Sequence, residues 1–458
     1  MSELVATSQQ GLVGKYQPYQ EYKDSGVEWL GNVPSHWTVT AVKRFASFTT
    51  GWTPPTGNDA YFGGEHLWAN ISDIGHRVLS TTAKTITDAG VRATRIKKSP
   101  KGSLLFSFKL SIGLVSIVGE DMYTNEAIAT FLPSETFNIS YMYWAAPLFI
   151  PQNAEENIYG AKLLNQERIS NASFVLPTPK EQRAIAAFLD YETARIDRLI
   201  AQQQRLIDLL KEKRQAMISH AVTKGLNPDA PMKDSGVEWL GQVPEHWVSS
   251  RVGWCCQVGN GCTPSRDNMD YWSEGTYPWL NSGKVNDGYI ISAEQFVTVT
   301  ALKECSLPKV PAGSIVMAIT GEGKTRGSVA MTGIDTTLSQ HLAFITVTSK
   351  KLSPMYLRIW LESQYQRIRF ESEGWGSTKA AITCSDIKSY PLPEPPLNEQ
   401  LKIVEYVGER SKTFDLLIHK SESMISVLQE RRTALISAAV TGKIDLRGWM
   451  PPVEEAAT

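Results

Sequence analysis

The sequence predicts an α+β protein built as a tandem, pseudo-twofold repeat: two α/β bodies joined by two long helices that pair as an antiparallel coiled coil. A nine-residue motif, Lys-Asp-Ser-Gly-Val-Glu-Trp-Leu-Gly, begins at Lys23 and recurs unchanged at Lys233, 210 residues later. A Pro-rich turn and a long heptad-patterned segment then close each half, from Pro177 and from Pro395. Because solenoid repeats are far shorter, this period indicates two whole domains built on one plan.

Bulk properties narrow the class of protein. A formal net charge of −1 over 458 residues gives no global field toward nucleic acid or an anionic membrane, so such binding needs local patches or partners. No apolar run approaches about 20 residues and no basic-then-apolar leader begins the chain, so we expect a cytoplasmic protein without a membrane segment. The cysteines form no Cys-x-x-Cys pair, which argues against a disulfide framework or a zinc site. They are Cys255, Cys256, Cys262, Cys305 and Cys384.

The repeated landmarks divide the chain into segments. Between the fixed ends, the two bodies diverge almost completely, which indicates that they do two versions of one task. The predicted segments are a first repeat and docking segment (1–37), body 1 (38–178), a first long helix (179–224), a linker with the second repeat motif (225–247), body 2 (248–394), a second long helix (395–442) and a tail (443–458).

Each long segment alternates apolar residues at spacings of three and four, which is typical of a coiled-coil seam. Gly225 and Gly442 mark the predicted helix ends. The helices could pair with each other or each with another protein, and internal antiparallel pairing needs no second molecule. Polar residues on the seam either fix its register or mark where it is solvated. The apolar seam residues are Leu189, Ile196, Leu199, Leu206, Leu210 and Met217 in the first helix, and Val407, Phe414, Leu417, Met424, Leu428 and Leu435 in the second.

A thin alignment survives inside the bodies. Gly51-Trp52-Thr53-Pro54 matches Gly261-Cys262-Thr263-Pro264. Short apolar runs separated by Gly, Pro, Asn and Ser predict the strands of a loop-rich α+β domain. These runs are 103–108, 114–118, 127–132, 314–320 and 342–347.

The paired Asp-Ser-Gly-Val-Glu-Trp-Leu-Gly-x-Val-Pro-x-His-Trp segments, the Gly-x-Thr-Pro loops and the Pro-x-x-x-Glu-Gln motifs resemble those of specificity (S) subunits of type I restriction-modification systems. The resemblance covers nearly the whole chain. It implies that the bodies are target recognition domains, each reading one half of an asymmetric bipartite target in double-stranded DNA. It also implies that the helices dock two methyltransferase (M) subunits, through which restriction/translocase (R) subunits join. The chain itself would bind no cofactor, and S-adenosylmethionine, ATP and Mg²⁺ would act in the partner subunits.

Basic and hydroxyl side chains in the bodies are the candidate DNA contacts, because Lys, Arg, Ser and Thr supply most hydrogen bonds to phosphates and bases. Body 1 has a basic run without acids over 92–101, and a loop at 109–111 corresponds to a longer loop at 324–326 in body 2. Isolated basic residues are more often merely solvated. The candidates are Arg92, Arg95, Lys97, Lys98, Lys101, Lys109, Ser111 and Lys162 in body 1, and Arg266, Lys284, Lys324, Thr325, Arg326 and Lys379 in body 2.

Two rival functions fit the sequence less well. Ala318-x-x-x-x-Gly-Lys-Thr satisfies a relaxed phosphate-loop pattern of a nucleotide-dependent enzyme, but the residues after Lys324 predict a strand where that motif needs a helix. No Asn/Asp-Pro-Pro-aromatic motif of an amino-methyltransferase occurs, so we expect a non-enzymatic subunit with no catalytic or metal site. A coiled-coil scaffold without DNA binding would leave the divergent bodies unexplained.

Overall fold

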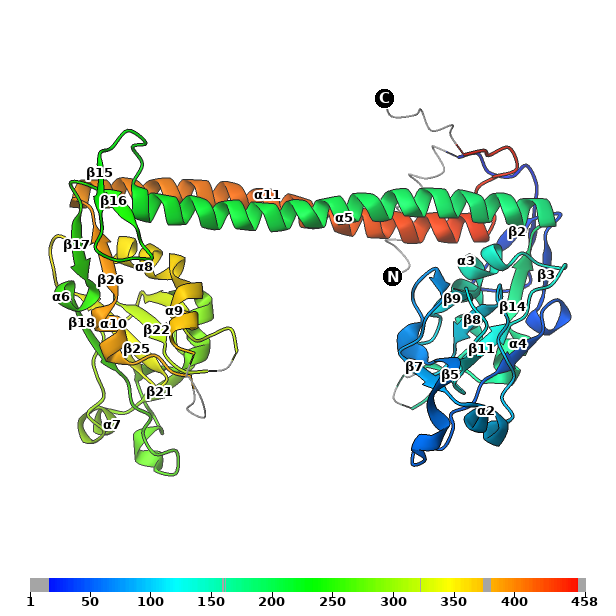
Figure 1. The fold of residues 1–458 in the computed structure, drawn as a ribbon, viewed down its shortest axis with the longest axis horizontal. Coiled ribbons are helices and arrows are strands. Elements are labelled where there is room, and N and C mark those ends of the chain that lie inside the picture. Colours follow the sequence, from blue (N-terminus) through cyan, green and yellow to red (C-terminus); the bar gives the residue numbers. More distant parts are fainter. Residues whose placement is uncertain (1–15, 159, 161, 322, 374–379, 452–458) are drawn as a thin grey trace. The chain divides into compact units, whose positions relative to one another are not determined.

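The computed structural model describes residues 16–158, 160, 162–321, 323–373 and 380–451, which form two compact units. Unit 1 joins the residues up to Gln204 with those from Ser423 onward, and unit 2 runs from Arg205 to Glu422. The long helices are α5 (Pro179–Lys224) and α11 (Leu397–Val440). Each unit therefore contains one body, part of α5 and part of α11 (Figure 1).

Body 1 is organised around a five-stranded sheet. Its order is β4 (Phe48–Thr50), β11 (Ile128–Phe131), β8 (Leu104–Ser107), β9 (Val115–Val118) and β6 (Val78–Leu79). A three-stranded sheet has the order β10 (Tyr123–Thr124), β5 (Phe62–Ala69) and β7 (Lys84–Ile86). Unit 1 also contains the strand pairs β1 (Tyr22–Asp24) with β2 (Asn32–Pro34), β3 (Thr38–Ala41) with β14 (Ser173–Leu176), and β12 (Glu155–Glu156) with β13 (Lys162–Leu163), and the helices α2 (Asp88–Thr94), α3 (Ile139–Phe149) and α4 (Gln166–Asn171).

Body 2 has the same sheets. The five-stranded sheet has the order β18 (Cys256–Asn260), β25 (Leu342–Val347), β22 (Ile315–Ala318), β23 (Val329–Thr332) and β20 (Tyr289–Ile290). The three-stranded sheet has the order β24 (Thr337–Leu338), β19 (Tyr277–Leu280) and β21 (Gln295–Val297). Unit 2 also contains the strand pairs β15 (Met232–Asp234) with β16 (Gln242–Pro244) and β17 (Val248–Arg251) with β26 (Pro391–Glu394), and the helices α6 (Val252–Cys255), α7 (Val299–Glu304), α8 (Pro354–Ser363), α9 (Tyr365–Glu371) and α10 (Cys384–Ser389).

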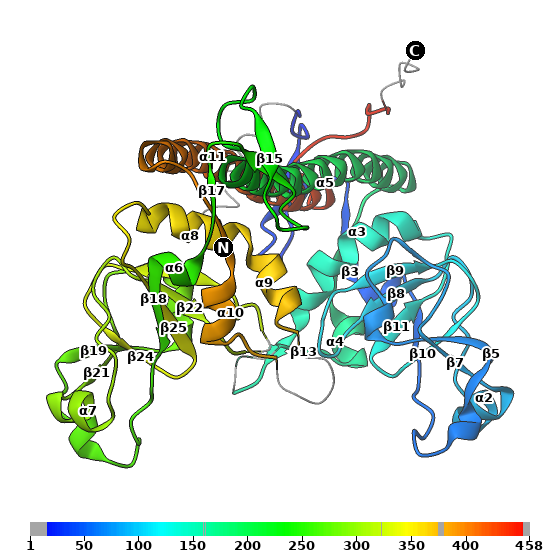
Figure 2. The same ribbon diagram turned by 60° about the vertical axis from the view of Figure 1, so that its left-hand side comes forward.

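The two bodies thus share one topology, although their sequences differ. In each five-stranded sheet the second strand runs antiparallel to the first and third, the third is antiparallel to the fourth, and the fifth is parallel to the fourth. Figure 2 shows β8, β9 and β11 beside one another in body 1, and β18, β22 and β25 in body 2. This confirms the predicted tandem repeat, and each of the five predicted apolar runs contains a strand.

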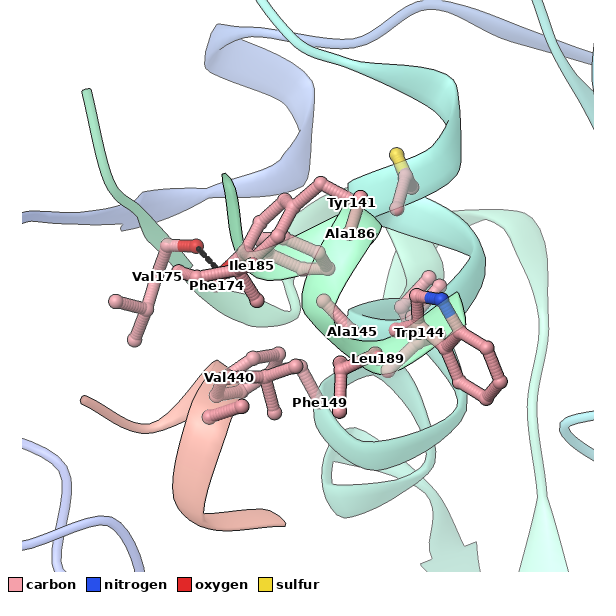
Figure 3. Packing of buried hydrophobic residues seen from close by; sticks show 14 of the residues in the cluster. Tyr141, Trp144, Ala145, Phe149, Phe174, Val175, Ile185, Ala186, Leu189 and Val440 are labelled. Atoms are coloured by element: carbon pink, nitrogen blue, oxygen red, sulfur yellow. Dashed lines mark hydrogen bonds between the residues drawn. The ribbon is translucent and has the colours of Figure 1, made fainter. Parts of the chain in front are cut away.

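Aromatic residues of α3 attach body 1 to the long helices. Tyr141 and Phe149 are 0% and 1% exposed, and they belong to one core cluster with Leu189 of α5 and Val440 of α11 (Figure 3). The Tyr141 hydroxyl donates a hydrogen bond to the Val175 carbonyl in β14 at 2.9 Å. Its polar group is therefore satisfied inside the core, where each aromatic side chain buries roughly 150–250 Å².

An equivalent cluster attaches body 2. Tyr356 and Trp360 of α8 are fully buried and cluster with Val222 of α5 and Val407 of α11. The Tyr356 hydroxyl donates to the Pro393 carbonyl in β26 at 2.9 Å. The same strand-to-helix hydrogen bond is therefore used in both units.

The two long helices run antiparallel, as predicted. In unit 1, Arg432 Nε lies 2.9 Å from Asp197 Oδ1, and in unit 2, Arg214 Nη1 lies 3.0 Å from Asp415 Oδ1. The partner's number falls as the number along α5 rises, which is the sign of antiparallel helices. Gly225 follows α5 directly with φ +76°, a left-handed conformation that ends helices and that only glycine adopts without strain.

The predicted seam is displaced by one residue at alternate positions. Leu199 and Leu206 are 38% and 43% exposed, whereas Ile207 is 2% exposed. In α11, Leu417 and Met424 are 41% and 49% exposed. The remaining seam residues lie inward: Leu189, Ile196, Val407, Leu428 and Leu435 are buried, and Leu210, Met217 and Phe414 are half-buried.

The physical reason is that two apolar frames coexist in each helix. Ile200, Ile207, Ile418 and Ile425 directly follow the displaced residues, and each is more buried than the residue before it. Spacings of three-four and four-three both average the 3.5 residues of a coiled coil, so the period alone does not choose between them.

Within the ranges given above, no helix has the length and apolar character needed to cross a membrane. In the same residues, no group of three or more His, Cys, Asp and Glu side chains is placed to hold a metal ion. All five cysteines are free thiols.

Candidate nucleic-acid interface

The topology of body 1 gathers three chain segments at one edge of the five-stranded sheet. Thr50 at the end of β4 pairs with Ala129 near the start of β11, and Ser107 at the end of β8 pairs with Ile128. The segments just beyond these strand ends therefore meet. We call this set, residues 51–56, 108–113 and 125–127, the loop edge of body 1.

Body 2 has a loop edge built in the same way. Asn260 at the end of β18 pairs with Ala343, and Ala318 at the end of β22 pairs with Leu342. The loop edge of body 2 comprises residues 261–266, 319–321, 323–328 and 339–341.

A glycine fixes the Gly-x-Thr-Pro loop in each body. A Cβ added to Gly51 would lie 1.8 Å from the Thr124 carbonyl oxygen, and one added to Gly261 would lie 2.0 Å from the Leu338 carbonyl oxygen. Real Cβ atoms do not approach a backbone oxygen so closely, so any other residue would push the loop off the sheet. The loop backbone can pack directly against the neighbouring strand because glycine has no Cβ.

The residue after each glycine has a fixed backbone and an exposed side chain. The Trp52 N–H donates to the Thr124 carbonyl at 2.9 Å, and its own carbonyl accepts from Trp68 Nε1 at 3.2 Å. Cys262 makes the same two bonds, to the Leu338 carbonyl at 2.9 Å and from Trp279 Nε1 at 3.1 Å. The Trp52 side chain is 59% exposed, and that of Cys262 is exposed too.

The threonine of each loop is tied to the turn before the second strand of the sheet. Thr53 Oγ1 donates to Glu126 Oε2 at 2.5 Å, and Thr263 Oγ1 donates to Gln340 Oε1. Burial acts to raise the pKa of the Glu126 carboxyl, but hydrogen bonds from Thr53 and the backbone, together with the charge of Lys109, lower this pKa overall. Glu126 is therefore a carboxylate at neutral pH, beside one of the predicted lysines.

The predicted loop at 109–111 lies on this edge. Lys109 and Ser111 are exposed, and Leu110 between them is 96% exposed with φ +60°. A non-glycine residue in the left-handed region is strained unless its surroundings hold it. Gly113 N–H donates to the Ser107 carbonyl at 2.9 Å and closes this loop.

The longer loop of body 2 contains three of the predicted contacts, which differ in exposure. Lys324 is exposed and Thr325 is half-buried, but Arg326 is only 3% exposed and donates from Nη1 to the Gly321 carbonyl at 3.4 Å. In this structure the Arg326 side chain is therefore not exposed at the surface, and its predicted DNA contact stays a prediction. The Tyr365 hydroxyl of α9 donates to the Lys324 carbonyl, which attaches this loop to the helix.

Arg266 follows the loop of body 2 and is pre-oriented. Its guanidinium lies 3.8 Å from the ring centroid of Trp272 and 5.0 Å from that of Trp279, and it donates to Gln295 Oε1 at 2.8 Å. Stacking on an aromatic ring holds the plane of an arginine while leaving further donors for a ligand.

Two lysines of the basic run of body 1 form ion pairs in the fold. Lys101 Nζ lies 3.2 Å from Glu120 Oε1, and Lys98 Nζ lies 3.7 Å from Asp121 Oδ2. These pairs lie near the start of β8, whereas Lys109 follows the end of this strand. Acids from the segment after β9 therefore pair with two of the five residues of this run, which the sequence alone shows as purely basic.

The other predicted contacts are scattered. Lys284 pairs with Asp287 at 3.0 Å and Glu294 at 3.2 Å, so it is already satisfied within body 2. Arg92, Arg95 and Lys97 are exposed at and after the end of α2, and Lys162 is exposed in β13. Lys379 lies outside the described residues.

Sequence reasoning did not list as candidates four residues that the fold places on the loop edges: Trp52, Leu110, Glu126 and Gln340. The signal for the first was present, because Trp52 and Cys262 are the only difference between the two Gly-x-Thr-Pro loops. The partnership of Glu126 with Thr53 spans 73 residues and has no local signal.

Comparisons with known proteins agree with this architecture. The family described as "Type I restriction modification DNA specificity domain" matches residues 34–208 and 244–423, once in each half. The MjaIX type I restriction enzyme specificity subunit of Methanocaldococcus jannaschii is 22% identical over 444 residues, covering 94% of this chain and 98% of the relative.

Two solved structures share the fold. One chain, from a structure on complex assembly and conformational transition of the type I R-M system, gives a TM-score of 0.69 at 16% identity, covering 89% of this chain and 98% of that one. The HsdS subunit from Thermoanaerobacter tengcongensis gives a TM-score of 0.54 at 17% identity, covering 90% and 98%. With the family match extending over well over half of its residues, this chain belongs to the family of type I restriction-modification DNA specificity subunits.

Proposed function

We propose that body 1 and body 2 each read one half of an asymmetric bipartite target in double-stranded DNA, through their loop edges. The observation that supports this most strongly is one sheet topology, used twice, with different exposed side chains on the same edge. Trp52 stands where Cys262 stands, and Glu126 where Gln340 stands. Because bases are distinguished by their donors, acceptors and methyl groups, two such edges predict two different half-sites.

We further propose that the chain is a non-catalytic subunit working in the cytoplasm, with S-adenosylmethionine, ATP and Mg²⁺ used by its partners. The rival phosphate-loop function lacks support because β23, a strand, is the next element after Lys324. A phosphate loop needs the N–H groups of a helix start at that place. The second rival, a scaffold without DNA binding, is disfavoured by the family match.

Exposed apolar side chains on the long helices support docking of two M subunits, one on each unit. Surfaces of this kind on an otherwise polar helix mark protein interaction sites. R subunits would then join through M. The exposed residues are Leu199 (38%), Met424 (49%) and Val427 (57%) in unit 1, and Leu206 (43%), Leu209 (44%), Leu416 (54%) and Leu417 (41%) in unit 2.

The test of DNA reading is to express the chain with M subunits in a host that lacks other methylation and to sequence the modified bases. We expect one bipartite motif whose two halves differ, separated by an unread spacer. The absence of any motif, or two identical halves, would contradict the proposal.

Binding strength provides a second test. With a net charge of −1, the chain alone should hold DNA weakly, and M subunits should add the phosphate contacts that make binding strong and salt-dependent. Titration of labelled target DNA with the chain alone and with M should give clearly different affinities. Equal affinities would contradict the proposed division of labour.

Docking of M is tested by Leu199→Asp with Met424→Asp, and by Gln202→Asp as a control on an exposed polar position of α5. The double variant should lose capture by tagged M while its circular dichroism stays that of the parent. The control should bind normally. Normal capture of the double variant would place the docking surface elsewhere.

A further inference from the structure

Glu126 and Gln340 occupy the same place in the two bodies. Each lies two residues before the second strand of the sheet, β11 or β25, and each accepts the hydroxyl hydrogen bond of the loop threonine. Both side chains therefore have the same anchor, but one ends in a carboxylate and the other in an amide, and Glu126 is half-buried where Gln340 is exposed.

The surroundings of this position are rigid in both bodies. The backbone of the neighbouring Gly-x-Thr-Pro loop is fixed by the bonds of Trp68 or Trp279 and by the glycine that touches the sheet. A group held on such a platform is pre-organised, so little side-chain freedom is lost when it meets a ligand.

The carboxylate of Glu126 can only accept hydrogen bonds. Its pKa is lowered overall by Thr53, the backbone and Lys109, against the effect of burial, so it stays ionised at neutral pH. A carboxylate has about four lone-pair sites, and hydrogen bonds from the Thr53 hydroxyl and from the backbone of Thr53 and Glu126 occupy part of them. The amide of Gln340 both donates and accepts: its Oε1 takes the Thr263 bond, and its Nε2 lies 3.2 Å from His341 Nε2.

The four bases respond differently to these two groups in the major groove. Guanine presents acceptors N7 and O6 and thymine presents O4, all of which repel a carboxylate. Adenine offers the N6 donor beside the N7 acceptor, which suits an amide that donates and accepts. Cytosine offers the N4 donor without an acceptor beside it, and therefore suits a carboxylate best.

We propose that Glu126 reads the exocyclic amino group of a cytosine in the half-site bound by body 1, and that Gln340 reads an adenine in the half-site bound by body 2. This inference rests on the proposed function, since it names the bases that two residues of the same interface recognise. The positive charge of Lys109 beside Glu126 offsets the repulsion between the carboxylate and the DNA phosphates. The exposed Trp52 supplies apolar surface on the same edge.

The experiment exchanges the two end groups in the complete complex with M subunits. Glu126→Gln is a conservative change with a precedent in this chain, because Gln340 makes the threonine bond in body 2. We expect one cytosine of the first half-site to become an adenine or a mixed base, with discrimination at that position falling on the order of 5- to 150-fold. The second half-site should not change. Gln340→Glu should produce the reciprocal change in the second half-site alone.

Two controls separate reading from support of the loop. Thr53→Val removes the hydroxyl but keeps the carboxylate, so it should slow methylation with the motif unchanged. Gly57→Ala adds a methyl group where no atom lies within 4 Å and should have no effect.

Each remaining outcome has one meaning. If Glu126→Gln leaves every base of the motif and its discrimination unchanged, or slows all sites equally as Thr53→Val does, the residue only supports the loop and the inference is wrong, although the proposed function stands. A parent complex that modifies no bipartite motif would instead overturn the proposed function itself.

Discussion

Glu181 and Glu399 stand in the first turn of α5 and α11, and each holds a histidine and a tryptophan of the repeated motif. In unit 1, Glu181 Oε1 accepts from Trp37 Nε1 at 3.1 Å and lies 2.9 Å from His36 Nε2. In unit 2, Glu399 Oε1 accepts from Trp247 Nε1 at 3.1 Å. The repeated frame thus forms the same hydrogen-bonded clamp in each unit, which ties the segment before each body to the start of a long helix.

The surroundings of the two clamps differ. The Glu181 side chain is 6% exposed and that of Glu399 is 23% exposed. Tyr19 adds a further hydrogen bond to Glu181 at 3.1 Å, and the Arg447 guanidinium lies over Tyr19 at 5.1 Å from the ring centroid.

These extra residues come from two separate parts of the chain. The Asp445 N–H donates to the Gln17 carbonyl at 2.7 Å, and the Tyr22 hydroxyl donates to the Gly442 carbonyl at 3.0 Å. In unit 2, a single continuous linker follows α5. The duplicated clamp therefore tolerates different coverings, and its carboxylate is buried more deeply in unit 1.

The largest expected effect is that of removing the buried acceptor. Glu181→Ala leaves the Trp37 and Tyr19 donors without a partner, which should destabilise unit 1 by about 2–5 kcal/mol. Glu399→Ala should cost unit 2 about 1–2 kcal/mol, since water reaches that site more easily. Hydrogen exchange measured separately over each unit would give both values, with Glu181→Gln as the matched control. A greater loss for Glu399→Ala would show that the depth of burial does not set the strength of the clamp.

The displaced seam makes the next prediction. Ile196→Ala removes a side chain that is 3% exposed and should cost about 2–4 kcal/mol, whereas Leu199→Ala, at 38% exposed, should cost under about 1 kcal/mol. Urea unfolding followed by hydrogen exchange in α5 would measure both. A larger loss for Leu199→Ala than for Ile196→Ala would show that Leu199 lies on the seam, as the sequence predicts.

The loop glycines come third. Gly51→Ala and Gly261→Ala force a Cβ onto a backbone oxygen and should each cost about 1–3 kcal/mol while weakening only the half-site of their own body. Gly57→Ala is the neutral control. Methylation of targets with one altered half would show which body is affected, and equal loss on both halves would argue against separate reading.

The smallest expected effect is the loss of folding stability at low pH. Burial acts to raise the pKa of Glu181, but hydrogen bonds from Thr178, His36 and Trp37 outweigh it, so the folded-state pKa is lowered. The stabilisation is therefore complete above the ordinary carboxyl pKa of 4.5 and is lost as the pH falls through the lower value. Thermal unfolding between pH 6 and pH 3 should lose stability less steeply in Glu181→Gln. If the stability of the parent and that of Glu181→Gln fell equally with pH, the Glu181 carboxylate would not contribute to the acid sensitivity.

The features that repeat along the sequence could be predicted, whereas the contacts of individual side chains could not. The duplicated motif and the heptads predict the tandem bodies and the antiparallel helices, because both signals repeat along the chain. The choice between Leu206 and Ile207 on the seam depends on packing between helices, which no period reveals.

The same limit applies to the interface. The sequence predicts Lys109 in a loop because it lies between the apolar runs 103–108 and 114–118, and in the structure it lies on the loop edge. The pairing of Lys101 with Glu120 and the bond of Tyr365 to the loop that contains Arg326 depend on contacts between distant segments. Composition shows a charge, but only the fold shows whether that charge is already paired.

The most direct test of the account is an exchange of one body. Residues 38–175 would be replaced by the corresponding body of another specificity subunit, and the bases methylated by the complex with M would be sequenced. The account predicts that one half of the bipartite motif changes while the other half stays as it was. A change in both halves, or in neither, would contradict the claim that each body reads its own half-site.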